Sequence, residues 1–110
     1  MKGPPGRVFT GRRDMPTLPA DVVECKRTRT FTHENVPRAL LTGHRTKAST
    51  WAVLNVESGA LVYRITEPGH EAEHVLGPRK RGVIAPEEEH HIQIVGAVAF
   101  HIQFFREPKT

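Results

Sequence analysis

Apolar and polar residues alternate along this chain with the two-residue period of β-strands, and this pattern constrains the fold more than any other feature. From Val22 onward, no segment of about ten residues carries an apolar stripe with helical spacing. The alternation is clearest in residues 51–57 and 60–66, and Ser58–Gly59 between them is a turn signal. The sequence therefore predicts a β-hairpin here.

Further strands are predicted on both sides of this hairpin. Residues 90–95 and 97–105 form a second predicted hairpin around Gly96. Two short strands are expected at residues 74–76 and 82–85. Many short strands punctuated by Gly and Pro are typical of an antiparallel sandwich or barrel. We therefore predict an all-β fold in a single domain.

One connection has features of a helix start. Asn35 precedes Val36–Pro37, and Asn is a favoured helix cap while Pro suits the first helical turn. Gly43 would end such a helix within two turns, so an irregular connection fits equally well.

Length, charge and motifs exclude several classes of protein. The 110 residues fit one domain, and no apolar run approaches the roughly 18 residues of a membrane span. Residues 1–14 are rich in Gly and Pro and hold four basic residues against one acidic, which accounts for +3 of the net charge of +4. They are predicted to be a flexible basic arm before a domain at residues 15–110. The nearly neutral remainder does not favour nucleic-acid binding, and no GxSxG, P-loop or GxGxxG motif occurs.

The cysteine content points to a reducing compartment. Cys25 is the single cysteine, so neither an internal disulfide nor a CxxC site can form. A cytoplasmic location is therefore expected. Cys25 lies in an alternating segment and is predicted to be a small buried side chain.

The chain has seven histidines, of which His44, His91 and His101 are of most interest. His91, His101 and Gln103 share one face of the second predicted hairpin, whereas the other face is apolar. In the simpler interpretation, the apolar face is core and the polar face meets water. In the alternative, the polar face lines a barrel lumen, and a second subunit covers the apolar face. A β-bulge near Gly96 would also flip the phase of the alternation between the two strands that flank it.

The remaining candidate residues are given surface or packing roles. Trp51 is interpreted as core or pocket wall, and the Glu87–Glu89 run as solvated loop. His70 and His74 are expected at the surface, and neither they nor His33 and His90 are expected to be metal ligands.

Two motifs carry a resemblance to a known family. Val36–Pro37 is followed by Leu40–Leu41, then by the His-Arg-Thr-Lys run that begins at His44, and later by His91, five residues after Pro86. With the residues around them, over 15–106, these motifs resemble the TehB/YeaR-like family. Its members are small cupin-like domains associated with tellurite resistance, found alone or ahead of a methyltransferase domain. The resemblance implies a cupin-like double-stranded β-helix (jelly roll). No methyltransferase activity is expected from so short a chain.

The resemblance also implies a set of metal ligands. The usual first-motif ligands of cupins would fall near Thr46, Ala48 and Ala52. The usual set is therefore absent, and His44, which lies close by, is expected to substitute for it. His91 matches the His of the second motif, with His101 or Gln103 assisting and a divalent Zn, Fe, Mn or Ni ion as cofactor. Gln103 stands where the family tends to have an acidic residue, which weakens binding of hard metals.

These features lead to one expectation and two alternatives. We expect a stand-alone domain that binds a metal or a small anion in its barrel pocket, with Lys47 and Trp51 shaping the mouth, in a tellurite, oxyanion or stress response. One alternative is a metal-dependent enzyme with an open coordination position in the same pocket. The other is a ligand-free homodimeric interaction module. The expected partners are a small molecule or anion and a second copy of the chain, without a membrane.

Overall fold

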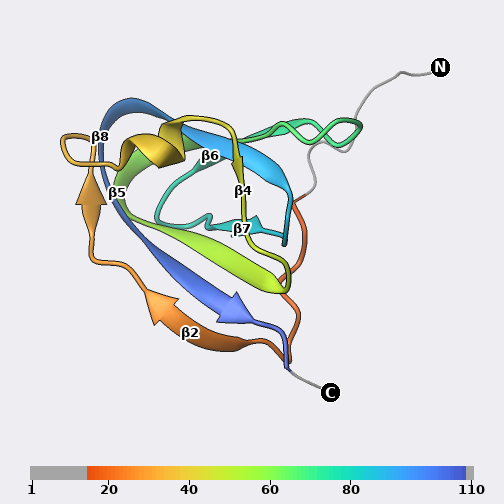
Figure 1. Ribbon diagram of the computed structural model, residues 1–110. Coiled ribbons are helices and arrows are strands. Elements are labelled where there is room, and N and C mark those ends of the chain that lie inside the picture. Colours follow the sequence, from red (N-terminus) through yellow and green to blue (C-terminus); the bar gives the residue numbers. More distant parts are fainter. Residues whose placement is uncertain (1–14, 109–110) are drawn as a thin grey trace.

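The computed structural model describes residues 15–108, and these fold into one antiparallel β-sheet. The predicted basic arm, residues 1–14, lies outside the described residues. Figure 1 shows the elements, which are β2 (Val23–Arg27), β3 (Phe31–Thr32), the 3-10 turn η2 (Arg38–Leu41), β4 (His44–Arg45), β5 (Thr50–Ile65), β6 (Ala72–Leu76), β7 (Gly82–Ile84) and β8 (Glu89–Arg106). The predicted all-β class is confirmed, and the segment that follows Pro37 makes only the short η2 turn.

Two long strands replace the two predicted hairpins. β5 and β8 pair with each other along their whole lengths, from Thr50 opposite Arg106 to Ile65 opposite His90. Both hairpin predictions are therefore wrong, because each alternating pair of segments continues through its turn signal as one strand. Each local pattern was compatible with a tight turn, but the long partner strand offers hydrogen bonds along the full length instead.

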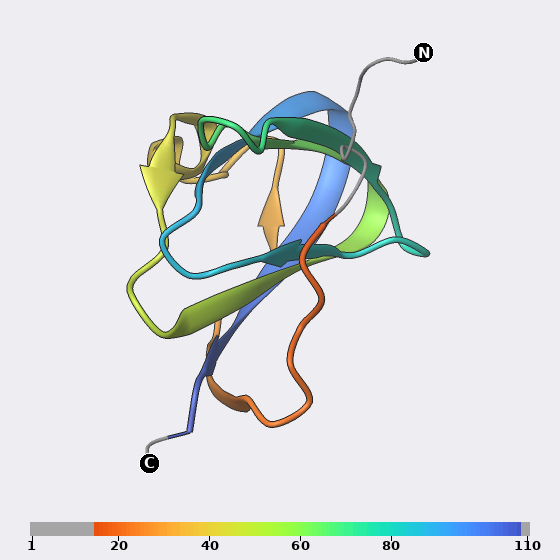
Figure 2. The same cartoon turned by 90° about the vertical axis from the view of Figure 1, so that its right-hand side faces the viewer.

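The turn signals mark the place where both strands bend. The β5–β8 register shifts between Val56 and Ser58 and again between Gly59 and Leu61. Gly59 has φ +78°, and a Cβ atom at this position would lie 2.1 Å from the Ala97 carbonyl oxygen. A glycine is required here both for its backbone angle and for its close approach to β8. Figures 1 and 2 show that β5 and β8 curve together, so the sheet folds over on itself.

Short strands extend the sheet on both sides of the long pair. β7 and β6 pair with successive halves of β5, while β2, β3 and β4 pair with β8. The predicted strands at residues 74–76 and 82–85 are confirmed as β6 and β7. Because the sheet is curved, its concave face encloses the core, whose largest fully buried side chains are Tyr63, Phe100, Leu54, Leu61 and Leu76.

The apolar face of β8 belongs to this core. Phe100 is 0% exposed and Ile102 is 4% exposed, and both belong to the hydrophobic cluster. The simpler interpretation of the sequence is therefore the one found, and the alternative, with the apolar face outside, is wrong. A second subunit is not needed to cover this face, although a homodimer stays a prediction. No helix among the described residues is long and apolar enough to span a membrane.

Candidate functional site

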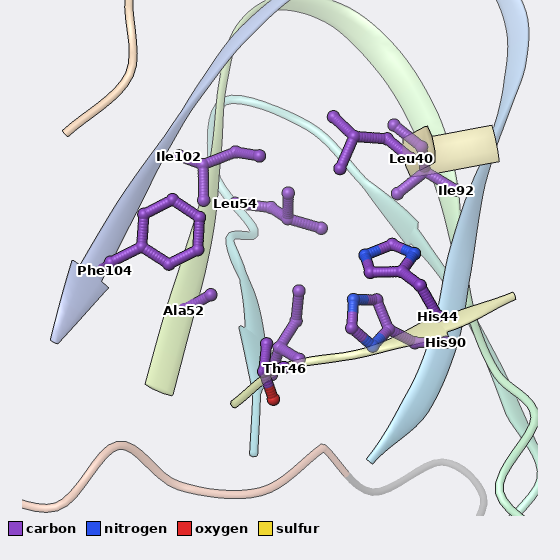
Figure 3. A pocket seen from close by; sticks show the side chains of 10 residues that line it. Leu40, His44, Thr46, Ala52, Leu54, His90, Ile92, Ile102 and Phe104 are labelled. Atoms are coloured by element: carbon purple, nitrogen blue, oxygen red, sulfur yellow. The ribbon is translucent and has the colours of Figure 1, made fainter. Parts of the chain in front are cut away.

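Two imidazole rings meet at one end of the curved sheet. His44 on β4 lies directly opposite His90 on β8 in the strand register, and the two ring centroids are 4.2 Å apart. His90 is only 3% exposed, whereas His44 is partly exposed. Figure 3 shows both rings directed into the same pocket, each with one nitrogen turned toward its interior.

The inner part of this pocket, here called the chamber, is small and apolar. Its volume is about 40 Å³. The side chains that line it are Leu40, His44, Thr46, Ala52, Leu54, Ile84, His90, Ile92, Ile102 and Phe104. A space of this size holds a hydroxyl group or a few water molecules, so a larger ligand could place only one end here.

Thr46 closes the chamber on the side of β7. Its hydroxyl donates a hydrogen bond to the Ala85 carbonyl oxygen at 2.7 Å and accepts one from the Glu87 amide at 3.0 Å. The Glu87 amide also approaches the Thr46 carbonyl oxygen at 3.1 Å. These bonds tie the segment after β4 to the connection between β7 and β8, and they occupy the Thr46 hydroxyl.

Backbone carbonyls hold both imidazoles. The Nδ1 atom of His44 lies 3.0 Å from the Thr42 carbonyl oxygen, and the Nδ1 atom of His90 lies 2.7 Å from that of Glu88. Burial lowers the pKa of His90 to about 4, because the charged ring loses its hydration, and this effect outweighs the hydrogen bond to Glu88. His90 is therefore neutral at physiological pH.

A wider groove leads from the chamber to the surface. It has a volume of about 480 Å³ and shares Leu40, His44, Thr46 and Phe104 with the chamber. Its other lining residues are Cys25, Lys26, Ala39, Arg45, Lys47, Thr50 and Arg106. Four of these carry a positive charge and none carries a negative one.

Among the described residues, carboxylates neutralise only Arg45 of the four groove cations. Arg45 contacts the Glu67 carboxylate at 2.6 Å and that of Glu89 at 3.8 Å. Within residues 15–108, no ion pair engages Lys26, Lys47 or Arg106. The mouth of the pocket therefore carries uncompensated positive charge, which favours an anion.

The structure does not bring the expected metal ligands together. His91 follows His90 directly, so strand alternation turns its side chain to the other face, and it does not line the chamber. Gln103 lies on the convex face, where its amide oxygen accepts a hydrogen bond from Asn55 at 2.9 Å. The Nδ1 atom of His101 lies 2.7 Å from the Glu57 carboxylate, also away from the chamber.

The two residues expected at the mouth of the pocket, Lys47 and Trp51, also lie in different places. Lys47 lines the groove. Trp51 lines neither the groove nor the chamber, and its indole Nε1 donates a hydrogen bond to the Glu107 carboxylate at 3.1 Å. Cys25 is exposed on the edge strand β2 and lines the groove, so the prediction of a buried cysteine is wrong. Edge strands leave side chains on both faces open where nothing packs over them.

His90 is the site residue that sequence analysis missed. It was not expected to be a ligand, and His74, which was expected at the surface, is 4% exposed. The signal was present, because His90 has the same parity as Ile92 and Ile102, and alternation places all three on the apolar face of β8. The prediction of this face rested on its apolar residues alone and did not include His90.

The donors at this site are too few for a typical metal centre. No group of three or more His, Cys, Asp and Glu side chains that could hold a metal ion occurs in the described part of the chain. The chamber supplies two imidazole nitrogens, whereas protein sites for divalent zinc usually supply about three or four ligands. The residues present therefore do not fit the expected divalent metal, and no chemistry is derived from one.

The fold and the pocket together define a small all-β domain with a pocket rimmed by cationic side chains. The family model described as the TehB-like domain matches residues 26–102, which is more than half of the chain. The chain therefore belongs to the TehB-like family, as the sequence motifs predicted. No curated protein sequence matches it significantly.

Two solved structures share this fold. A structural-genomics protein from E. coli (strain K12) is 20% identical, with a TM-score of 0.77 over 86% of this chain and 100% of that one. TehB from Haemophilus influenzae is 25% identical, with a TM-score of 0.72 over 80% of this chain. The match covers 32% of the TehB chain, so this chain corresponds to about a third of that protein.

Proposed function

We propose that this chain binds a small anion in the groove and chamber at the β4–β8 end of the sheet. The observation that carries the proposal is the cluster of Lys26, Lys47 and Arg106, which have no ion-pair partner among residues 15–108 and surround a concave site without a carboxylate. The association of the family with tellurite resistance supports an oxyanion or another anionic product of stress as the ligand.

The electrostatics favour modest and salt-sensitive binding. All three cations are exposed, so water and salt screen their attraction for an anion. An exposed charge pair contributes about 0–1 kcal/mol, which corresponds to at most about a fivefold change in affinity for each cation. Several cations around one concavity add their contributions, and the groove walls reduce the solvent between them and a bound ion.

The finer fold class forms part of the same proposal. We assign the domain to the cupin-like double-stranded β-helix, because both long strands bend at the same place and are flanked by short antiparallel strands on each side. In such a fold the concave space between the bent halves is the usual place for a ligand. The cytoplasmic location stays a prediction from the cysteine content.

The test is a titration of the ¹⁵N-labelled protein with sodium selenite, tellurite, phosphate and sulfate, followed by amide chemical shifts. At least one of these anions is expected to cause saturable shifts around Thr46, Lys47 and Arg106. The variants Lys47→Ala and Arg106→Ala should each weaken binding by about two- to fivefold. Lys80→Ala and Arg79→Ala are the matched controls, because both residues are exposed and lie outside the groove.

Two results would overturn the proposal. One is the absence of saturable shifts with all four anions at low ionic strength. The other is a set of shifts that weakens equally in the groove variants and in the Lys80 and Arg79 controls, because this would show binding to surface charge in general.

A further inference from the structure

The hydrogen bonds of His44 and His90 determine which ring nitrogen carries the proton. A carbonyl oxygen only accepts hydrogen bonds, so the Nδ1 atoms facing Thr42 and Glu88 must be the protonated ones. In a neutral imidazole, Nε2 is then an acceptor with a free lone pair. Figure 3 shows the outer ring nitrogen of each residue turned toward the pocket interior.

The chamber offers no other polar atom to a ligand. The hydroxyl of Thr46 is occupied by the Ala85 carbonyl oxygen and the Glu87 amide, and the remaining lining side chains are hydrocarbon. The inner end of the pocket therefore presents two neighbouring hydrogen-bond acceptors and no donor. Two lone pairs on rings 4.2 Å apart attract a hydrogen-bond donor and repel a bare anionic oxygen.

The outer groove has the opposite preference, because Lys26, Lys47 and Arg106 attract negative charge. One ligand satisfies both ends if it combines charged oxygens with an O–H group. We propose that the His44–His90 pair makes this pocket selective for oxyanions that carry a hydroxyl group over fully deprotonated oxyanions of the same size and charge. This inference rests on the proposed anion-binding function.

The dimensions of the site agree with such a ligand. The chamber of about 40 Å³ accommodates a hydroxyl group, and the groove of about 480 Å³ accommodates the body of a tetrahedral or pyramidal oxyanion. The hydroxyl proton would be donated to Nε2 of His44 or His90, and no covalent bond needs to form or break. A fully deprotonated ion would place an oxygen lone pair against the two imidazole lone pairs, which costs binding energy.

The test compares hydrogen phosphate with sulfate, which share shape and a double negative charge but differ by one proton. Titrations run at about pH 8, where an ordinary imidazole is neutral, and at constant ionic strength. Phosphate is expected to bind about tenfold more tightly than sulfate, the effect of one hydrogen bond made in place of a repulsive contact. Arsenate against selenate repeats the comparison with larger ions.

The variant His44→Phe keeps a ring but removes the acceptor. It should reduce the ratio of the affinities for phosphate and sulfate to about one, mainly by weakening phosphate binding. His70→Phe, in an exposed loop, should leave this ratio unchanged. Histidine ¹⁵N spectra of the unaltered protein give a readout that does not depend on the variant folding. They should show unprotonated Nε2 atoms on both rings, at least one of which shifts when phosphate is added.

The outcomes separate this inference from the proposed function. Equal binding of phosphate and sulfate in the groove, or tighter binding of sulfate, overturns the selectivity and leaves the anion site intact. Protonated Nε2 atoms in the unliganded protein also overturn it. If no anion binds, the proposed function fails, and the selectivity fails with it.

Discussion

His44 and His90 face each other across the β4–β8 pair with their ring centroids 4.2 Å apart and their planes inclined by 59°. They come from distant parts of the chain, and β4 is only two residues long. So short a strand has little stability of its own, and its position depends on its hydrogen bonds to β8 and on the contacts of Thr46. The geometry of the site is therefore a property of the closed sheet.

The Thr46 hydroxyl should contribute measurably to that closure. The substitution Thr46→Val keeps the shape of the side chain but leaves the Ala85 carbonyl and the Glu87 amide without this partner. We expect the free energy of unfolding to fall by about 1–3 kcal/mol. Thr42→Val is the control, because the Thr42 hydroxyl is exposed and makes only a 3.5 Å contact. Chemical denaturation of the three proteins measures the difference, and equal losses in both variants would contradict the role of Thr46.

Burial of His90 should make the protein less stable in mild acid. Its pKa is lowered to about 4 in the folded state, while an unfolded histidine titrates near about 6.5. Between these values the unfolded chain binds the extra proton, so the free energy of unfolding falls as pH decreases from about 6.5 to about 4, by up to about 3 kcal/mol.

Denaturant midpoints at pH values across this range test the effect of His90. The variant His90→Phe should lose much of the dependence, and His70→Gln should retain it, because His70 is exposed. An unchanged slope in His90→Phe would assign the acid sensitivity to other groups.

Two glycines with positive φ should respond differently to alanine. Gly59 and Gly69 have φ of +78° and +85°, so alanine strains the backbone at both, by about 1–2 kcal/mol. At Gly59 the new Cβ would also collide with the Ala97 carbonyl oxygen, whereas at Gly69 no atom of residues 15–108 lies within 4 Å of it. We expect Gly59→Ala to lower the melting temperature clearly more than Gly69→Ala. Similar melting temperatures for the two variants would mean that β8 moves away easily.

Adjacent residues of β8 should show which face is core. Ile102 is 4% exposed, and Ile102→Ala should cost about 2–5 kcal/mol of unfolding free energy. Gln103→Ala removes hydrogen bonds to Asn55 and Glu24 on the convex face and should cost about 1 kcal/mol or less. Urea denaturation measures the free energy of unfolding of both variants. A larger decrease in Gln103→Ala than in Ile102→Ala would reverse the assignment of the faces.

The local properties of this protein follow from the order of its residues alone. The two-residue alternation of residues 51–65 and 90–105 made these segments strands with one apolar face, and the motifs from Val36 to His91 identified the family. His44 and Lys47, which were expected at the pocket, both line the groove. These features depend on residues close together in the chain.

The pairing of the strands and the meeting of His44 with His90 depend instead on the complete folded sheet. Ser58–Gly59 suits a tight turn or a bulge equally well, and the presence of a full-length partner strand selected the bulge. In the same way, the expectation of His91 as partner to His44 depended on a lumen lined by the polar face. The apolar face of β8 is buried in the core instead, so the side chain of His90 points into the chamber and that of His91 points away from it. The physical reason is that the free energy gained by burying the apolar face is summed over the side chains of the whole sheet. This sum outweighs the preference of any single side chain for one face.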